Sequence, residues 1–314
     1  MQRPRRKTEP RRHVCVIVNE SAATYRPEPI ERLTAAIRKR GDQYTVIRPK
    51  SAHELSDAAQ AACGRRRGRR LLPQMFERRG RVTSLVACGG DGTFNLVARA
   101  ARFADIPVGL LPMGRFNNIG RSLYTDLGAA ACIKRIAGRE VRLIDVGNVS
   151  GQPFFGAIGL GLIPHLTRML ADQKTPRLGM GWARVVGQAA SKIEPKKLVV
   201  KVDAFRFEIS PTLLNVNLLS HAGGLAMSPA SLTDDRRAEI IFDVSVGHRE
   251  LGTFARQLHS GKFLYGANVR LFRGSVITIQ PIQGRTLYLD GELIELPTNL
   301  VEIKIDDKQL KVFQ

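Results

Sequence analysis

A glycine-rich segment that carries one carboxylate, Gly89-Gly90-Asp91-Gly92-Thr93, is the part of the sequence best suited to chemistry. Glycines let a backbone approach phosphate groups closely, and the start of a following helix presents unpaired N–H groups to anions. A carboxylate would repel phosphate directly, so Asp91 fits best if a Mg²⁺ ion lies between the two. The segment follows a strand-like run and precedes a helical one, which favours a nucleotide site over an ordinary glycine-rich turn.

The residues around this segment alternate between strand and helix patterns. Strands are predicted at residues 14–18, 44–47, 82–88 and 107–111, and helices at residues 29–40, 52–62 and 93–103. Continuous β-branched runs such as the first are typical of parallel strands that are buried on both faces. We therefore predict an N-terminal α/β domain with a parallel sheet, over residues 13–140, that binds the nucleotide.

From about Val141 strand-like runs dominate the sequence. They lie at residues 141–146, 154–158, 198–202, 213–219, 239–246, 275–280, 286–289 and 301–305. Helical spacing interrupts them near residues 182–191 and 251–258. The prediction is a C-terminal, mostly antiparallel β-sandwich domain over residues 141–305. The final residues, about 306–314, could return to the first domain.

Five motifs follow one another along the chain, at residues 86–95, 106–120, 143–147, 217–229 and 289–292. In this order they resemble the catalytic domain of the diacylglycerol kinases, which sphingosine and ceramide kinases share. The resemblance implies a bacterial-type, two-domain lipid kinase that binds ATP and Mg²⁺ in the cleft between its domains. The γ-phosphoryl group of ATP would pass to the hydroxyl of a lipid held by the β-rich domain.

The resemblance also assigns roles to single residues. Asp91 and Asp145 would place the catalytic Mg²⁺. Asp290 and Glu292 would orient or deprotonate the acceptor hydroxyl, with Glu292 as the base, because a hydroxyl is a poor nucleophile. Asp290-Gly291 alone is equally typical of a type I′ hairpin turn. The residues that would bind the nucleotide are Asn19, Gly89, Gly90, Asp91, Gly92, Thr93, Phe94, Asn95, Gly114, Arg115 and Asn117.

A second, structural Mg²⁺ is implied at Asp235, which aligns with a metal-binding aspartate of the family. Arg236 stands where the family usually has a glycine, and a local cation opposes metal binding. The sequence leaves open whether this second site exists.

Departures from the family pattern bear on activity, among them the loss of a threonine after the second strand, where Arg48 or Pro49 stands. Glu20 brings negative charge to the first loop, where the family's glycine is missing. Arg115 replaces a threonine and could either bind phosphate as a charged fork or block the nucleotide pocket. Asn118 replaces an aspartate and removes one carboxylate. Two alternatives stay open: a non-catalytic nucleotide- or lipid-binding relative, and an NAD kinase-like phosphotransferase, which also carries GGDGT.

The formal charge of +21 is unevenly distributed, since residues 1–12 and 64–81 together supply 12 of the excess positive charges. Such a field attracts polyanions, so we predict peripheral association with an anionic membrane surface, where the lipid substrate lies. Solvated basic segments are the alternative. Nucleic-acid binding is disfavoured because these runs lack interleaved aromatic residues apart from Phe76.

The four cysteines form no C-x-x-C pair, which predicts reduced thiols in the cytoplasm and neither disulfides nor a zinc site. No run of about 20 apolar residues occurs, so no transmembrane span is predicted. We therefore expect a cytoplasmic, peripherally membrane-associated protein. A homodimer stays open.

Overall fold

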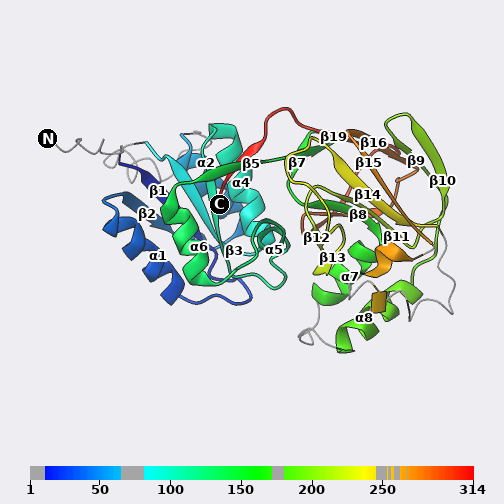
Figure 1. Ribbon diagram of the computed structural model, residues 1–314, viewed down its shortest axis with the longest axis horizontal. Helices are drawn as coiled ribbons and strands as arrows, with labels where there is room; N and C mark the ends of the chain where they lie inside the picture. The colour runs from blue at the N-terminus through cyan, green and yellow to red at the C-terminus, as the bar shows by residue number, and fades with distance from the viewer. Residues whose placement is uncertain are drawn as a thin grey trace, which may run out of the picture.

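The computed structural model describes residues 11–64, 81–171, 180–244, 253, 256–257, 262–266 and 268–314. Nearly all of the two arginine-rich segments, and most of the helix predicted near 251–258, lie outside these residues. The chain forms two domains that lie side by side (Figure 1). Within the described ranges, no helix combines the length and apolar character needed to cross a membrane.

The first domain is built on a six-stranded sheet with the strand order β2-β1-β3-β4-β20-β5. The first four strands in this order are parallel, whereas β20 is parallel to β4 and antiparallel to β5. Every residue of β1 and β3 is buried, as expected for strands covered on both faces. The strands are β1 (His13–Val18), β2 (Gln43–Ile47), β3 (Ser84–Gly89), β4 (Val108–Pro112), β5 (Val141–Ile144) and β20 (Leu310–Phe313).

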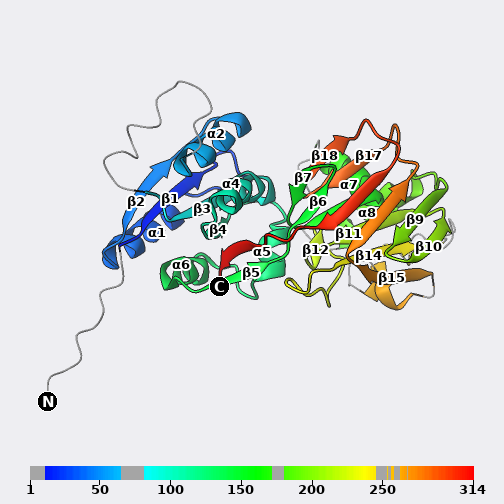
Figure 2. The same cartoon turned by 90° about the horizontal axis from the view of Figure 1, so that it is seen from above.

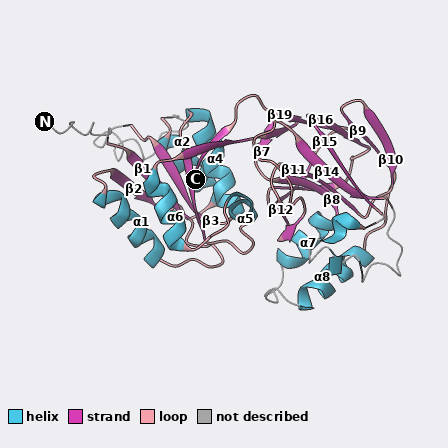
Figure 3. Cartoon of the chain, viewed as in Figure 1, coloured by secondary structure: helices cyan, strands magenta, loops and turns pink. Residues whose placement is uncertain are grey.

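Helices cover both faces of this sheet (Figure 3). They are α1 (Glu28–Lys39), α2 (Ala52–Ala62), α4 (Asp91–Ala104), α5 (Asn118–Leu123) and α6 (Ala129–Gly138). On one face Leu33 of α1 shares a buried cluster with Val16 and with residues of α6. On the other, Val97 of α4 shares a cluster with Ile17 and with residues of α2. Neighbouring residues of β1 thus serve two different cores, because side chains alternate along a strand.

The second domain contains two antiparallel six-stranded sheets, in the orders β10-β9-β16-β19-β6-β7 and β15-β14-β11-β8-β17-β18. Their facing sides share one buried cluster, in which Val200 and Ile303 of the first sheet meet Val216 and Leu289 of the second. The strands are β6 (Gly147–Val149), β7 (Gln152–Phe154), β8 (Ala157–Gly161), β9 (Leu198–Val202), β10 (Phe205–Ile209), β11 (Leu213–Asn217), β14 (Ala238–Asp243), β15 (Val269–Gly274), β16 (Val276–Gln280), β17 (Thr286–Leu289), β18 (Glu292–Glu295) and β19 (Val301–Ile305). The predicted β-sandwich is confirmed.

Two helices, α7 (Leu162–Ala171) and α8 (Met180–Ser191), cover the outer side of the second sheet. Leu166 of α7 and Val186 of α8 pack there with Leu213 of β11 and Ile241 of β14. A short hairpin, β12 (His221–Ala222) and β13 (Leu225–Ala226), and a 3₁₀ turn, η1 (Lys262–Tyr265), complete the described elements. The hairpin lies beside α5 of the first domain.

The strand expected to open the second domain belongs to the first. Val141–Ile144 pairs with β20 at the edge of the parallel sheet, and the sandwich begins at Gly147. The strand predicted over residues 141–146 was assigned to the second domain. That assignment was wrong, because apolar alternation does not reveal which sheet a strand enters. The chain then returns from β19, and Figure 2 shows this last segment running from the sandwich to the first sheet.

Candidate active site

Two loops meet by their backbones at the end of β3. Gly90 directly precedes α4 and lies against Gly114, which follows β4. A Cβ on Gly114 would collide with the Gly90 Cα, and it would also lie 2.8 Å from Asn117 Oδ1. A Cβ on Gly89 would come within 2.6 Å of the Thr93 Cβ. The glycines are therefore required by close packing, and they leave the backbone N–H groups at the start of α4 near the surface of the loop.

Two asparagines hold these loops in place. The Asn19 side-chain amide donates to Thr93 Oγ1 at 3.0 Å, and its backbone N–H donates to the Cys88 carbonyl at 2.9 Å. Asn117 has a left-handed backbone with φ 51°, and its side chain both accepts from Gly114 N at 2.8 Å and donates to Gly114 O at 3.0 Å. The structure thus brings Asn19, Gly114 and Asn117 together with the glycine-rich loop.

The negative charge in the first loop has a partner of its own. Glu20 lies 3.1 Å from the Arg48 Nε, and it accepts a hydrogen bond from the Tyr25 hydroxyl, also at 3.1 Å. The ion pair is about half exposed at both ends, so water screens it. The negative charge of Glu20 would therefore repel a bound phosphate less than its place in the sequence indicates, because Arg48 partly neutralises it.

Asp91 lies in the first turn of α4, two residues earlier than the predicted helix start. One carboxylate oxygen accepts from the Asn118 backbone N–H at 2.9 Å and from its side-chain amide at 3.0 Å, and the other accepts from Ile119 N at 3.0 Å. Asp91 therefore caps α5. Burial raises the pKa of the Asp91 carboxyl, although these three N–H donors act in the opposite direction.

Asn118 connects Asp91 to the second domain. Its side-chain oxygen accepts a hydrogen bond from Gly224 N, after β12, at 2.9 Å. An aspartate at this position would place a second negative charge against Asp91 unless a cation lay between them. The amide avoids that repulsion. Asn118 was noted in the sequence only for the carboxylate it lacks, and its role as a donor to Asp91 depends on a contact between α4 and α5.

Asp290 is buried at the turn between β17 and β18. Its carboxylate accepts from the backbone N–H groups of Phe155, Gly156 and Ala157 at 2.6, 2.7 and 2.8 Å. Burial raises the pKa of Asp290 to about 6, more than these donors lower it. Asp290 (φ 49°) and Gly291 (φ 105°) form the two-residue loop of a hairpin, which the Asp-Gly pair also predicted. The Asp290 carboxylate therefore holds the segment after β7, and its part in orienting or deprotonating an acceptor hydroxyl stays a prediction.

Asn95 and Tyr288 complete a buried polar cluster between the domains. Asn95 lies on α4 and is 1% exposed, and its proximity lowers the pKa of Asp290, although its side-chain amide makes no hydrogen bond to a described residue. Tyr288 is buried beside Asp91 and Asp290. Burial is the main cause that raises the pKa of its hydroxyl, and the negative charges of the two carboxylates raise it further. Beside the cluster, the Phe94 and Phe155 rings meet edge to face at 6.2 Å. The sequence did not single out Tyr288, whose one signal is its place two residues before Asp290.

Glu292, the predicted base, is the first residue of β18 and its side chain is exposed. It pairs in register with Leu289 across the hairpin that Asp290 closes. The structure therefore places it next to the buried cluster along the chain, on the solvent side. Its role as the base stays a prediction.

Asp145 lies in a different environment from Asp91. Its buried carboxylate accepts from Arg236 N at 2.7 Å and from Gln309 Nε2 at 2.9 Å, at the crossing between the domains. Asp235 lies 3.6 Å from the Arg273 guanidinium. Among the described residues, no three His, Cys, Asp or Glu side chains converge in a way that could hold a metal ion. The metal roles of Asp145 and Asp235 stay predictions, and the Arg273 guanidinium beside Asp235 opposes a cation there.

Arg115, noted as either a phosphate ligand or a block, reaches the other domain. Its Nη1 donates to the Leu170 carbonyl near the end of α7. The adjacent Phe116 ring lies so close to Gly224 that a Cβ there would come within 2.6 Å of it. The loop after β4 thus holds the two domains together, and in this arrangement the guanidinium is bound to α7.

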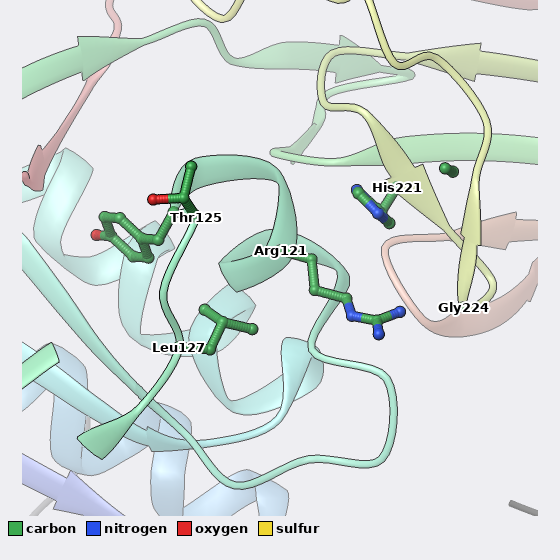
Figure 4. Close-up of a pocket in the computed structure, with 7 residues that line it drawn as sticks. Arg121, Thr125, Leu127, His221 and Gly224 are labelled. Carbon is green, nitrogen blue, oxygen red and sulfur yellow. The ribbon is translucent and has the colours of Figure 1, made fainter. Parts of the chain in front are cut away.

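A cavity of about 540 Å³ opens between α5 and the β12–β13 hairpin. Figure 4 shows Arg121 of α5 extending toward the hairpin that carries His221 and Gly224. Burial, and then the charge of Arg121, lower the pKa of His221, so its ring is neutral at neutral pH. The cavity is lined by Arg121, Tyr124, Thr125, Leu127, His221, Gly224 and Ala226.

A magnesium nucleotide fits the loop around Asp91. Mg²⁺ at such sites is usually held by one or two carboxylates together with phosphate oxygens and water. An ionised carboxylate offers about four lone-pair positions, and Asp91 uses three of them for Asn118 and Ile119. Asp91 can therefore still accept one metal-bound water.

Comparisons with known proteins show which proteins this chain is similar to. Residues 13–149 match the family model described as the diacylglycerol kinase catalytic domain. A diacylglycerol kinase of Bacillus subtilis (strain 168) is 24% identical over 215 residues, 66% of this chain and 70% of the relative. A Pseudomonas fluorescens protein named "Probable lipid kinase YegS-like" is 28% identical over 221 residues, 68% of this chain and 72% of the relative. A diacylglycerol kinase structure from Bacillus anthracis (strain Sterne) superposes with a TM-score of 0.69 at 17% identity, over 96% of both chains, and shows the same fold.

Proposed function

We propose that the chain, as a member of the diacylglycerol kinase catalytic-domain family, is an ATP-dependent lipid kinase. It would transfer the γ-phosphoryl group of ATP to the hydroxyl of a diacylglycerol-, sphingoid- or ceramide-like membrane lipid. The observation that carries this proposal is the backbone contact between Gly90 and Gly114, with Asp91 at the start of α4. This arrangement suits a triphosphate, because glycine backbones and a helix start leave N–H groups free for anions.

The first domain would bind the nucleotide. Gly89 to Gly92 would contact the phosphates through backbone N–H groups, with Asn19 and Thr93 fixing the loop from one side. When bound, Mg²⁺ would neutralise charge on the phosphates. Asp91 would orient that ion through a water molecule, and Asn118 would hold the Asp91 carboxylate at the start of α5.

The second domain would bind the acceptor. Glu292 is our assignment for the base, because it is exposed and follows the hairpin turn of the buried cluster. The cavity beside Arg121 and His221 is large enough for a polar headgroup, and its single guanidinium favours an anionic one. Association with an anionic membrane surface would bring the protein to its lipid substrate.

A lipid panel tests the proposed function. Purified protein is incubated with labelled ATP, Mg²⁺ and micelles that contain diacylglycerol, a sphingoid base or ceramide, and a parallel reaction contains NAD. We expect phosphorylation of at least one lipid and none of NAD. Phosphorylation of NAD alone would establish the NAD kinase-like alternative. Binding of Mg-ATP without turnover of any acceptor would establish a non-catalytic relative.

A further inference from the structure

The chain crosses between its domains twice, and the crossings lie side by side (Figure 2). Asp306 N donates to the Val146 carbonyl at 2.8 Å, and Gln309 donates to Asp145 at 2.9 Å. Arg102 of α4 adds an ion pair of 2.8 Å with Asp306. The junction is therefore built from both crossings, and residues that bridge them set how the domains sit together.

Arg236 enters this junction from the loop before β14. Its backbone N–H donates to one oxygen of Asp145 at 2.7 Å, and its Nε lies 3.7 Å from the other oxygen. Its Nη1 donates to the Asp306 carbonyl at 3.2 Å. One residue of the sandwich thus contacts both crossings.

Two further acidic residues surround the junction. Arg273 of β15 lies 2.7 Å from Glu239 and 3.6 Å from Asp235. Burial raises the pKa of the Asp145 and Glu239 carboxyls, and the charge of Asp235 raises both further. Ionised carboxylates in such a place need cations close by. Arg236 and Arg273 are the cations that the described part of the chain places against them.

The backbone at Arg236 favours a different residue. Its φ of 60° is in the left-handed region, where glycine is free of strain and a long side chain is not. An arginine at this position is explained if its guanidinium contributes something that glycine cannot. The contributions visible here are positive charge beside Asp145 and a hydrogen bond to the Asp306 carbonyl.

We propose that the Arg236 guanidinium replaces a structural divalent cation at the junction, so that the arrangement of the two domains does not depend on Mg²⁺. Three carboxylates and two guanidinium groups leave a local charge of −1. Without Arg236 the local charge is −2, which one divalent cation would neutralise. With Arg236 present, the same cation would meet a guanidinium at its binding position and be repelled.

The test is thermal unfolding without nucleotide, in EDTA and in millimolar Mg²⁺. The wild-type Tm should be the same in both. Arg236→Gly suits the backbone and removes the cation, so its Tm should fall in EDTA and rise by about 4 °C or more in Mg²⁺. Arg237→Gly, which removes an exposed arginine one residue further on, should show no response to Mg²⁺.

A wild-type Tm that falls in EDTA overturns the proposal, and so does an Arg236→Gly variant that ignores Mg²⁺. If Arg236→Gly does not fold, Arg236→Asn takes its place, because asparagine tolerates the left-handed backbone without a charge. The same Mg²⁺ response is then expected, and its absence has the same meaning. Nucleotide is left out so that a metal ion at Asp91 does not contribute to the shift.

Discussion

Asp91 combines two tasks in one carboxylate, since it caps α5 and would orient the metal ion. Asp91→Asn preserves shape and removes the charge, so we expect kcat to fall by about 10² or more. The measurement is lipid phosphorylation at saturating ATP, together with Tm. Asp105→Asn is the matched control: Asp105 is the left-handed C-cap of α4, and asparagine tolerates that backbone. Wild-type kcat in the Asp91 variant would remove Asp91 from the site.

Glu292 can be tested without disturbing the fold, because its side chain is exposed. Glu292→Gln should lower kcat by about 10² to 10⁴ and leave the KM for ATP unchanged, as expected for loss of a general base. Glu295→Gln, at the other end of β18, should behave as wild type. Equal kcat values for the two variants would show that the base lies elsewhere.

Asp290 makes stability depend on pH. Its pKa is raised to about 6 by burial, so the folded state holds the proton more tightly than the unfolded state. The stabilisation is fully present below the unfolded pKa, near 4, and is lost as pH rises through about 6. Relative to Asp290→Asn, wild type should lose about 2 kcal/mol of unfolding free energy between pH 4 and pH 7. Denaturant unfolding at both pH values measures this, and a constant difference would contradict the raised pKa.

At the scale of elements, the shape of the glycine-rich loop at Gly89 depends on the distance between two turns. Gly114→Ala would push its Cβ against Gly90 and Asn117, so the loops should separate and ATP affinity should fall about tenfold or more. Gly138→Ala is the control, because a Cβ at the end of α6 has nothing within 4 Å. Calorimetric ATP binding compares the two. Unchanged affinity in Gly114→Ala would show that the contact does not shape the site.

Local pattern predicted the longer elements well. The helix over residues 52–62 and the strand over residues 198–202 have the predicted bounds, because each has its own periodicity and stop signals. The six residues of α5 were missed, since this helix follows a left-handed Asn117 and takes its cap from Asp91. That cap is a tertiary contact and has no signal in the sequence nearby.

The same limit applies to the candidate site. Glycine spacing located the loop at Gly89, because backbone requirements are local. The buried surroundings of Asp290 and the involvement of Tyr288 arise only when the hairpin of β17 and β18 meets α4 and the turn after β7. The environment of Asp145 likewise depends on Arg236, which is distant along the chain.

At the scale of the whole molecule, the basic segments predict how the protein meets its substrate. Binding to vesicles should rise with the fraction of anionic lipid and fall with added salt, because exposed charges act within about 10 Å at 0.1 M. Replacing Arg65, Arg66 and Arg67 by glutamine should weaken binding more than the same change at three exposed residues, Arg32 and Lys39 of α1 and its C-cap Arg40. Vesicle flotation measures this, and equal binding to neutral and anionic vesicles would exclude it.

The insertion of β20 between β4 and β5 has a consequence for synthesis on the ribosome. The neighbours β4 and β5 are made early, yet the strand that joins them, Leu310–Phe313, is translated only after the entire sandwich. The sheet of the first domain therefore lacks its fifth strand until the rest of the chain has been translated. Pairing between segments so distant along the chain, such as β4 and β20, slows folding. Nascent chains halted before residue 310 should therefore engage chaperones, and those carried past Phe313 should be released from them.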